Sequence, residues 1–279
     1  MADQLTSSGG TQSAITPEIW STNFQDNLRN ADVLSPIIRH DYEGEIQGPG
    51  DTVHIPSVPD VTATDLNEGA AGEATSSTAS VTDLVINTMT HVDFKITTQA
   101  QLQSIEFIDE LEKRAMSAIQ LKMQANMFSA ISPSTSSPDH VISYDGASTL
   151  ADSDLLEVLD LETTANWPVD GKWLVTGGAQ YNDLLNIAKF YDKDTNAGDS
   201  PSVTGQVIAP VYGHRVRWTG AAGTTTYMFH DSFMQVAVQR GLNMSLHDIG
   251  VNGERGFRLN IDVLYGIKQL HNDRVVTIG

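Results

Sequence analysis

The chain has 279 residues, 40% of them hydrophobic, so it can bury a core in one or two domains. The absence of cysteine excludes disulfides, zinc–thiolate sites and thiol chemistry. A formal net charge of −19 argues against tight nucleic-acid binding, which needs clustered cations, although the protein could lie near nucleic acid without adhering to it. No run approaches the ~18 apolar residues of a membrane span, and neither a signal peptide nor a membrane partner is expected.

The N-terminal region predicts an arm followed by a short helix. Residues 1–15 are rich in Ser, Thr, Gly and Gln and have no apolar periodicity, which is typical of a flexible arm. The sequence TPE at residues 16–18 is typical of a helix start, with a threonine cap, a first-turn proline and an acid. Trp20, Phe24 and Leu28 then recur at every fourth position and predict an amphipathic helix.

Residues 51–96 predict one elongated β-hairpin with a polar tip. Apolar residues alternate along the ascending strand and over residues 84–96 of the descending strand, the period of a half-buried strand. A two-stranded ribbon of this length is barely stable alone, so its apolar face needs a partner, and another subunit is the simplest one. The predicted intersubunit contacts are Val53, Ile55, Leu84, Ile86, Val92 and Phe94 on this face, with Trp20 and Phe24 from the N-terminal helix.

A long helix is predicted over residues 98–131, which contain neither glycine nor proline. Apolar residues recur at spacings of three and four and form one stripe, and Ser132-Pro133 ends the run. A helix of roughly 30 residues is a rod of about 45 Å, much longer than the average helix of about 11 residues.

The remainder predicts a compact unit and a long closing strand. Helices are expected from residue 152 and over residues 179–189, and strands over residues 172–176, 207–218, 227–230 and 233–238. Residues 257–267 alternate most clearly of all and precede a short strand at residues 274–278. Because the closing strand and the long helix both need an apolar partner, we expect them to pack together.

This order of elements resembles the major capsid protein of tailed bacteriophages, which has the Hong Kong 97-type fold. The resemblance is carried by GDTVHIPSVPDVTATDLNEG (residues 50–69), VDFKIT (residues 92–97), GKWLVTGGAQYNDLLN (residues 171–186) and GFRLNIDVLYGIKQL (residues 256–270). Each segment is weakly specific, but their order and spacing extend over nearly the whole chain.

The resemblance implies an α+β fold with four parts: an N-arm with a short helix (1–41), an extended loop (42–97), a peripheral domain with spine helix and closing strand (98–150 and 241–279), and an axial domain (151–240). It also implies hexamers and pentamers that form an icosahedral head in the virion, assembled in the host cytoplasm. The implied partners are packaged double-stranded DNA without sequence-specific binding, a scaffolding protein, a portal and, optionally, a decoration protein.

Two departures from some relatives concern assembly. Only about 15 residues precede the first predicted helix, so the scaffold is expected to be a separate protein. Some relatives cross-link through a loop lysine, but this chain has no Lys or Arg between Arg39 and Lys95. Covalent locking from the loop is therefore not expected.

Sites of chemistry are poorly supported, so no catalytic residue, metal ligand or cofactor is expected. Residues 192–199 resemble the start of a calcium loop, but Ala197 and Val203 stand where that loop needs glycine and a bidentate glutamate. His91 and Asp93 have no third ligand nearby. The glycines at 177–178 precede a helix and could hold an anion, but no Walker lysine follows.

Two alternative functions, each of a different class of protein, also fit parts of the sequence. An encapsulin-like cellular shell would need the same subunit, but its particles would enclose protein cargo. A monomeric binding module or enzyme would be built on residues 169–240 and would work as an isolated domain. The long hairpin, whose apolar face needs a partner, argues against a monomer.

Overall fold

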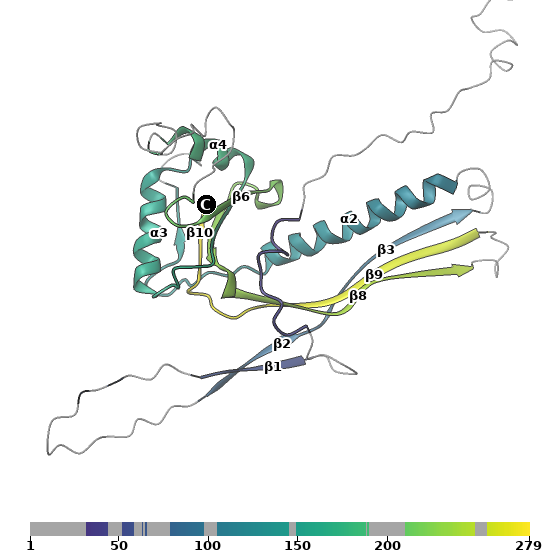
Figure 1. Cartoon of the computed structure of the whole chain (residues 1–279), viewed down its shortest axis with the longest axis horizontal. Coiled ribbons are helices and arrows are strands. Elements are labelled where there is room, and N and C mark those ends of the chain that lie inside the picture. Colours follow the sequence, from purple (N-terminus) through teal and green to yellow (C-terminus); the bar gives the residue numbers. More distant parts are fainter. Residues whose placement is uncertain are drawn as a thin grey trace, which may run out of the picture.

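The computed structural model describes residues 32–43, 52–58, 63, 65, 79–97, 105–144, 149–187, 189, 210–248 and 256–279. These residues form a long sheet lined by one helix, a compact unit at one end of it, and a hairpin that crosses below (Figure 1). The predicted N-terminal arm, the helix with Trp20 and Phe24, most of the hairpin tip and the acidic loop at residues 192–199 lie outside the described residues.

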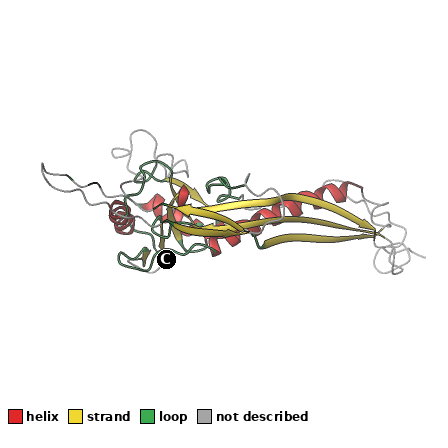
Figure 2. Ribbon diagram, turned by 90° about the horizontal axis from the view of Figure 1, so that it is seen from below, coloured by secondary structure: helices red, strands yellow, loops and turns green. Residues whose placement is uncertain are grey.

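The long sheet contains β3 (Thr88–Thr97), β9 (Gly256–Gln269) and β8 (Met234–Asp248), with β9 in the centre and both pairings antiparallel. The helix α2 (Ile105–Ser129) runs along the strands (Figure 2). The apolar residues that alternate on β9 meet the apolar stripe of α2 in a buried cluster of Ala115, Ile119, Leu259, Ile261, Val263 and Tyr265. The expected packing of the closing strand against the long helix is confirmed.

The Tyr265 hydroxyl ties three elements of this layer together. It accepts a hydrogen bond from Asn126 Nδ2 of α2 at 2.7 Å and lies 3.1 Å from Thr90 Oγ1 of β3. Because the tyrosine is fully buried, these two partners satisfy a polar group inside an otherwise apolar interface. The helix and the sheet therefore form one rigid plate.

The compact unit is built on a five-stranded sheet with the order β4-β10-β7-β5-β6. Its strands are β4 (Val141–Ile142), β5 (Lys172–Thr176), β6 (Arg215–Trp218), β7 (Thr226–His230) and β10 (Val275–Ile278). The helices α3 (Asp152–Thr164) and α4 (Gly178–Asn186) pack on one face through Leu155, Val158 and Leu184. The other face packs on Leu34, Met127 and Phe128, so the end of α2 is part of this second core. Two short turns of 3-10 helix, η1 (Gly220–Ala222) and η2 (Asp231–Phe233), flank β7.

The prediction of one continuous hairpin is wrong. β1 (Thr52–Ser57) pairs with β2 (Ser80–Val85), but the chain leaves that ribbon at residues 86–87, and β3 pairs with β9 instead. The cause is the apolar side of β3, where Val92 and Phe94 pack against the cluster under α2 of the same chain. The descending strand thus serves two sheets.

Several predicted boundaries also change. The strand predicted at residues 233–238 continues to Asp248, and β6 begins only at Arg215. β10 pairs with β7 and β4, so it belongs to the sheet of the compact unit. Both of its faces are buried there, with Val275 in one core and Val276 and Ile278 in the other. The proposed division at residues 150 and 241 therefore does not follow the two sheets.

The described helices contain no segment with the apolar length that crossing a bilayer requires.

Candidate functional site

The described side chains include no group of three or more His, Asp or Glu placed to hold a metal ion. Asp93 instead accepts hydrogen bonds from Arg258 Nη2 at 2.5 Å and Asn260 Nδ2 at 2.7 Å across the strands. The bond from Arg258 is the main cause that holds the pKa of Asp93 below its usual value. His91 and Asp93 thus belong to a polar surface of the sheet. The candidate functional features are instead a groove and the exposed surfaces of the molecule.

A groove between the hairpin, the segment after α2 and the end of β9 also lacks catalytic character. It is lined by Thr82, residues 132–136 and residues 267–270, which are mainly small, polar or aliphatic. Among the described residues that line it, Lys268 is the one charged group. The groove therefore provides no nucleophile and general base in combination.

The inner side of the hairpin is buried in its own chain. Ile55, Leu84 and Ile86 are 7%, 0% and 5% exposed and form a cluster with Ala237 of β8, against which Val53 is partly buried. The expectation that this apolar side needs another subunit is corrected for these residues, because the long sheet of the same chain covers it.

A glycine in β9 allows this close crossing. A Cβ added at Gly266 would lie 2.5 Å from the Val85 carbonyl oxygen and 3.1 Å from the Ile86 Cα. No side chain larger than hydrogen fits there without moving the backbone of the hairpin. Gly266 therefore sets where the ribbon crosses the sheet, on the side opposite α2 (Figure 1).

The opposite side of β2 carries two apolar residues that the described part of the chain leaves exposed. Val81 and Val85 of β2 are 61% and 40% exposed and flank Asp83, whose carboxylate lies 2.6 Å from His54 Nδ1 of β1. We call Val81 and Val85 with the His54–Asp83 pair the outer hairpin face. In the sequence, Val81 and Val85 stand at alternate positions with Asp83, which places all three on one side of the strand. The larger apolar residues Leu84 and Ile86 draw the sequence-based prediction to the inner side instead.

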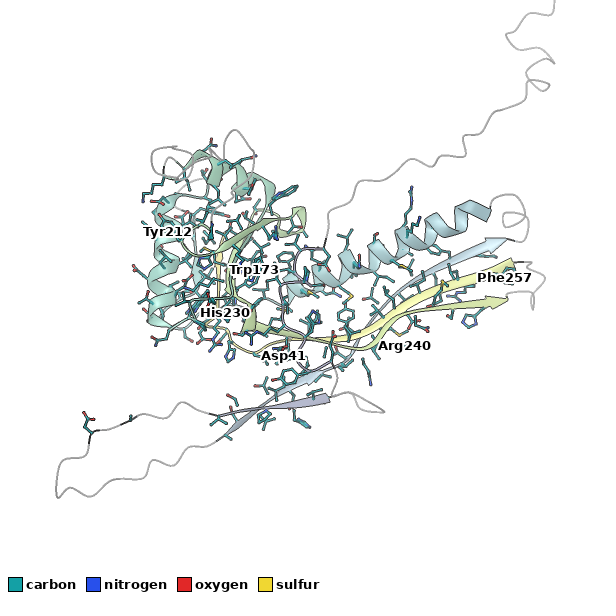
Figure 3. All side chains as sticks on the ribbon, in the orientation of Figure 1. Asp41, Trp173, Tyr212, His230, Arg240 and Phe257 are labelled. Atoms are coloured by element: carbon teal, nitrogen blue, oxygen red, sulfur yellow. The ribbon has the colours of Figure 1, made fainter. Side chains whose placement is uncertain are left out.

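The root of the hairpin is fixed at the junction between the compact unit and the long sheet. Arg39 Nη2 lies 3.1 Å from Asp231 Oδ1, and the Arg39 carbonyl accepts a hydrogen bond from the Val236 N–H at 3.2 Å. Gln235 Nε2 donates to Asp41 Oδ2 at 3.0 Å. Asp41 and His230 mark this junction in Figure 3. The segment that leads into the hairpin is therefore held by both parts of the molecule.

A buried ionic group stabilises the compact unit. Glu162 Oε2 of α3 lies 2.6 Å from Lys172 Nζ of β5, and its Oε1 lies 2.6 Å from His214 Nε2. The side chains of Glu162 and His214 are 3% and 0% exposed. Burial alone raises the pKa of Glu162, but its contacts with His214 and Lys172 outweigh burial and hold the pKa below its usual value.

Replacing Glu162 with glutamine is expected to lower the free energy of unfolding at pH 7 by roughly 2–4 kcal/mol, because Lys172 would lose the carboxylate that balances its charge in a largely buried site. Since the folded pKa is depressed, the contribution of the carboxylate is complete above the unfolded pKa of about 4.3 and is lost as the pH falls through the folded pKa. Urea unfolding of both proteins at pH 7 and pH 3 measures this.

The control for this variant is Asp273→Asn, which removes an exposed carboxylate from the same unit. It should leave the unfolding midpoint nearly unchanged at both pH values. An equal stability gap between wild type and Glu162→Gln at pH 7 and pH 3 would contradict the assigned protonation behaviour.

No protein-family model matches the sequence, and no curated protein matches it.

Solved structures match almost the entire chain. A chain from Mycobacterium phage Che8 is 20% identical, with a TM-score of 0.75 over 95% of this chain and 97% of the other. The capsid structure of the cyanophage P-SCSP1u gives 12% identity and a TM-score of 0.77 over 98% and 96%. The capsid of a native GTA particle gives 9% identity and a TM-score of 0.73 over 99% of each chain. The chain therefore has the α+β Hong Kong 97-type fold of these solved structures.

Proposed function

We propose that this chain is the major capsid protein of a tailed double-stranded DNA bacteriophage and assembles into the hexamers and pentamers of an icosahedral head. The observation that carries the proposal is the fold likeness, which extends over nearly the whole of this chain and of the matched chains, two of which come from capsid structures. In this proposal the role is structural and not enzymatic, and the location is the virion capsid after assembly in the host cytoplasm. Chains that share a fold can differ in function, so the proposal needs its own test.

The parts of the chain take different roles in this proposal. α2 and the long sheet form the rigid plate of the peripheral domain, the compact unit is the axial domain, and the β1–β2 ribbon is the extended loop. A shell needs many modest contacts rather than a few strong ones, because buried area does not convert directly into affinity. A separate scaffolding protein, a portal and an optional decoration protein are the proposed protein partners, and the genome is enclosed without sequence-specific binding.

The ribbon remains the proposed strap between subunits, but its contact surface changes. Ile55, Leu84 and Ile86 are occupied by their own chain, so the outer hairpin face is the side that can reach a neighbour. Exposed valines on a two-stranded ribbon form a surface that a neighbouring chain can cover. Trp20 and Phe24 stay predicted contacts from the N-terminal helix.

The proposal predicts that the full chain, expressed with the genes beside its own, forms closed shells or capsomers. Negative-stain electron microscopy and sedimentation velocity measure this directly. Shells that retain nuclease-protected DNA are expected, whereas shells filled with protein cargo would favour a cellular compartment. A 30.2 kDa monomer at every concentration and with every partner would refute the capsid function.

A further inference from the structure

The last strand of the compact sheet has an unusual exposed edge. β6 pairs with β5 on one side, and no other described strand pairs with its other side. The guanidinium carbons of Arg215 and Arg217 lie 5.3 Å and 6.0 Å from the ring centroid of Trp173 on β5. Trp218, on the opposite face of β6, is 56% exposed and lies 6.3 Å from the Tyr181 ring. We call Arg215, Arg217 and Trp218 the basic edge.

The two arginines have no carboxylate partner among the described residues of their own chain, unlike several other cations. This is notable because the chain has 35 acidic residues and only 16 Lys and Arg residues. Five other described cations form ion pairs with carboxylates of the same chain, namely Arg39, Lys172, Lys189, Arg240 and Arg258. No described carboxylate lies within 4.0 Å of the Arg215 or Arg217 side-chain nitrogens. Both arginine side chains are exposed and lie against Trp173, so their N–H donors are available to a carboxylate of another molecule.

A surface of opposite sign lies elsewhere on the same unit. α3 buries Leu155 and Val158 against the sheet and exposes Leu156, Glu157 and Asp160 on its outer side, with Leu156 41% exposed. No described cation lies within 4.0 Å of the Glu157 or Asp160 carboxylates. We call Leu156, Glu157 and Asp160 the acidic helix face.

The two surfaces lie at different places on the compact unit. The basic edge is at the border of the sheet, whereas α3 covers one of its faces. In Figure 1, α3 forms the outer margin of the unit and β6 lies on the side nearer α2. One copy therefore cannot close the contact on itself in this conformation, but two copies can.

We propose that the basic edge of one copy docks on the acidic helix face of the next copy. This inference rests on the proposed function, because it assigns two surfaces to the contacts within a capsomer. In this contact the two exposed arginines of one copy face the two exposed carboxylates of the next. Such a contact joins two different surfaces, so repeating it builds a ring when the rotation between copies closes, and not a two-fold dimer.

A second copy fits the basic edge better than a nucleic acid does. Non-specific DNA binding depends on several cations acting on neighbouring phosphates, and the edge offers two on a chain with a net charge of −19. A second copy brings the acidic helix face, whose two exposed carboxylates have the charge opposite to that of the arginines. Electrostatic complementarity then selects the docking partner and its orientation.

Charge reversal tests the pairing. The double variant Arg215→Glu/Arg217→Glu and the double variant Glu157→Arg/Asp160→Arg are each expected to raise the protein concentration needed for capsomers by about tenfold or more, because like charges then face each other. The four-residue variant that combines both reversals is expected to recover assembly. Sedimentation velocity measures the assembled fraction, and urea unfolding verifies that each variant is folded.

The matched control for the arginine variant is Lys113→Glu/Lys122→Glu, which changes the net charge in the same direction and by the same amount at two exposed positions of α2. It is expected to assemble like the wild type. Assembly of both charge-reversed double variants at the wild-type concentration would overturn the pairing and leave the capsid function intact, whereas a wild type that never assembles would refute both. Failure of the combined variant to recover would show that the two surfaces do not face each other. Normal assembly of Arg215→Glu/Arg217→Glu with reduced DNA retention would instead assign the arginines to nucleic acid.

Discussion

Aspartate at both Val81 and Val85 is expected to prevent shell assembly while the chain still folds. Both valines lie on the outer hairpin face, 61% and 40% exposed, so a charge there costs little in the isolated chain. In a shell, a neighbour would cover the same positions and bury two carboxylates without a cation partner, which costs several kcal/mol. We expect the concentration needed for assembly to rise by about 100-fold or more, as sedimentation velocity would measure.

A variant at the neighbouring position Leu84 distinguishes the role of the inner side of the strand from that of the outer side. Leu84 is 0% exposed and points toward Ala237, so Leu84→Asp is expected to lower the free energy of unfolding by roughly 3–5 kcal/mol before any assembly step. Urea unfolding distinguishes this from the outer variant, whose midpoint should match the wild type. Normal shells from Val81→Asp/Val85→Asp would remove the outer hairpin face from the contacts between subunits.

The sequence was most informative where one period extends along one element. The alternation over residues 257–267 and the stripe along the long helix each predicted a buried side, and the structure brings these two sides together. The same reasoning failed at residues 86–87, where the strand period continues without a break but the pairing partner changes from β1 to β9. Periodicity reports which side of a strand is buried, and it carries no information about which strand lies beside it.

The contact surface was harder to predict for the same reason. Alternation correctly placed Ile55, Leu84 and Ile86 on one side, but it could not tell whether their own chain or a neighbour covers them. The local signal that bears on this question is Gly266, an isolated glycine within the clearest strand, since glycine inside a strand often marks a close backbone approach. Arg215 and Arg217 likewise gain meaning only when β6 is known to be a sheet edge next to Trp173.

The adjacent glycines at positions 177 and 178 suggest an anion-binding site in the sequence, but packing explains why a glycine is needed there. They resemble an anion-binding helix start, yet the structure explains Gly177 by packing. A Cβ at Gly177 would lie 1.9 Å from the carbonyl oxygen of Gly223, a backbone atom of the turn that follows η1. A Cβ at Gly178 would have no atom within 4 Å. Only the first glycine is therefore required by its surroundings.

Alanine at Gly177 is accordingly expected to lower the free energy of unfolding by about 2–4 kcal/mol, because either α4 or the turn at Gly223 must move. Gly178→Ala is expected to be neutral or to stabilise by up to about 1 kcal/mol, since alanine favours the first turn of α4. Urea unfolding of the two variants gives the comparison, and equal midpoints would show that the turn yields without cost. Gly223 is joined to β6 through Thr219 and η1, so we expect a displacement of this turn to shift the end of β6 and to weaken assembly at temperatures where the Gly177→Ala chain remains folded.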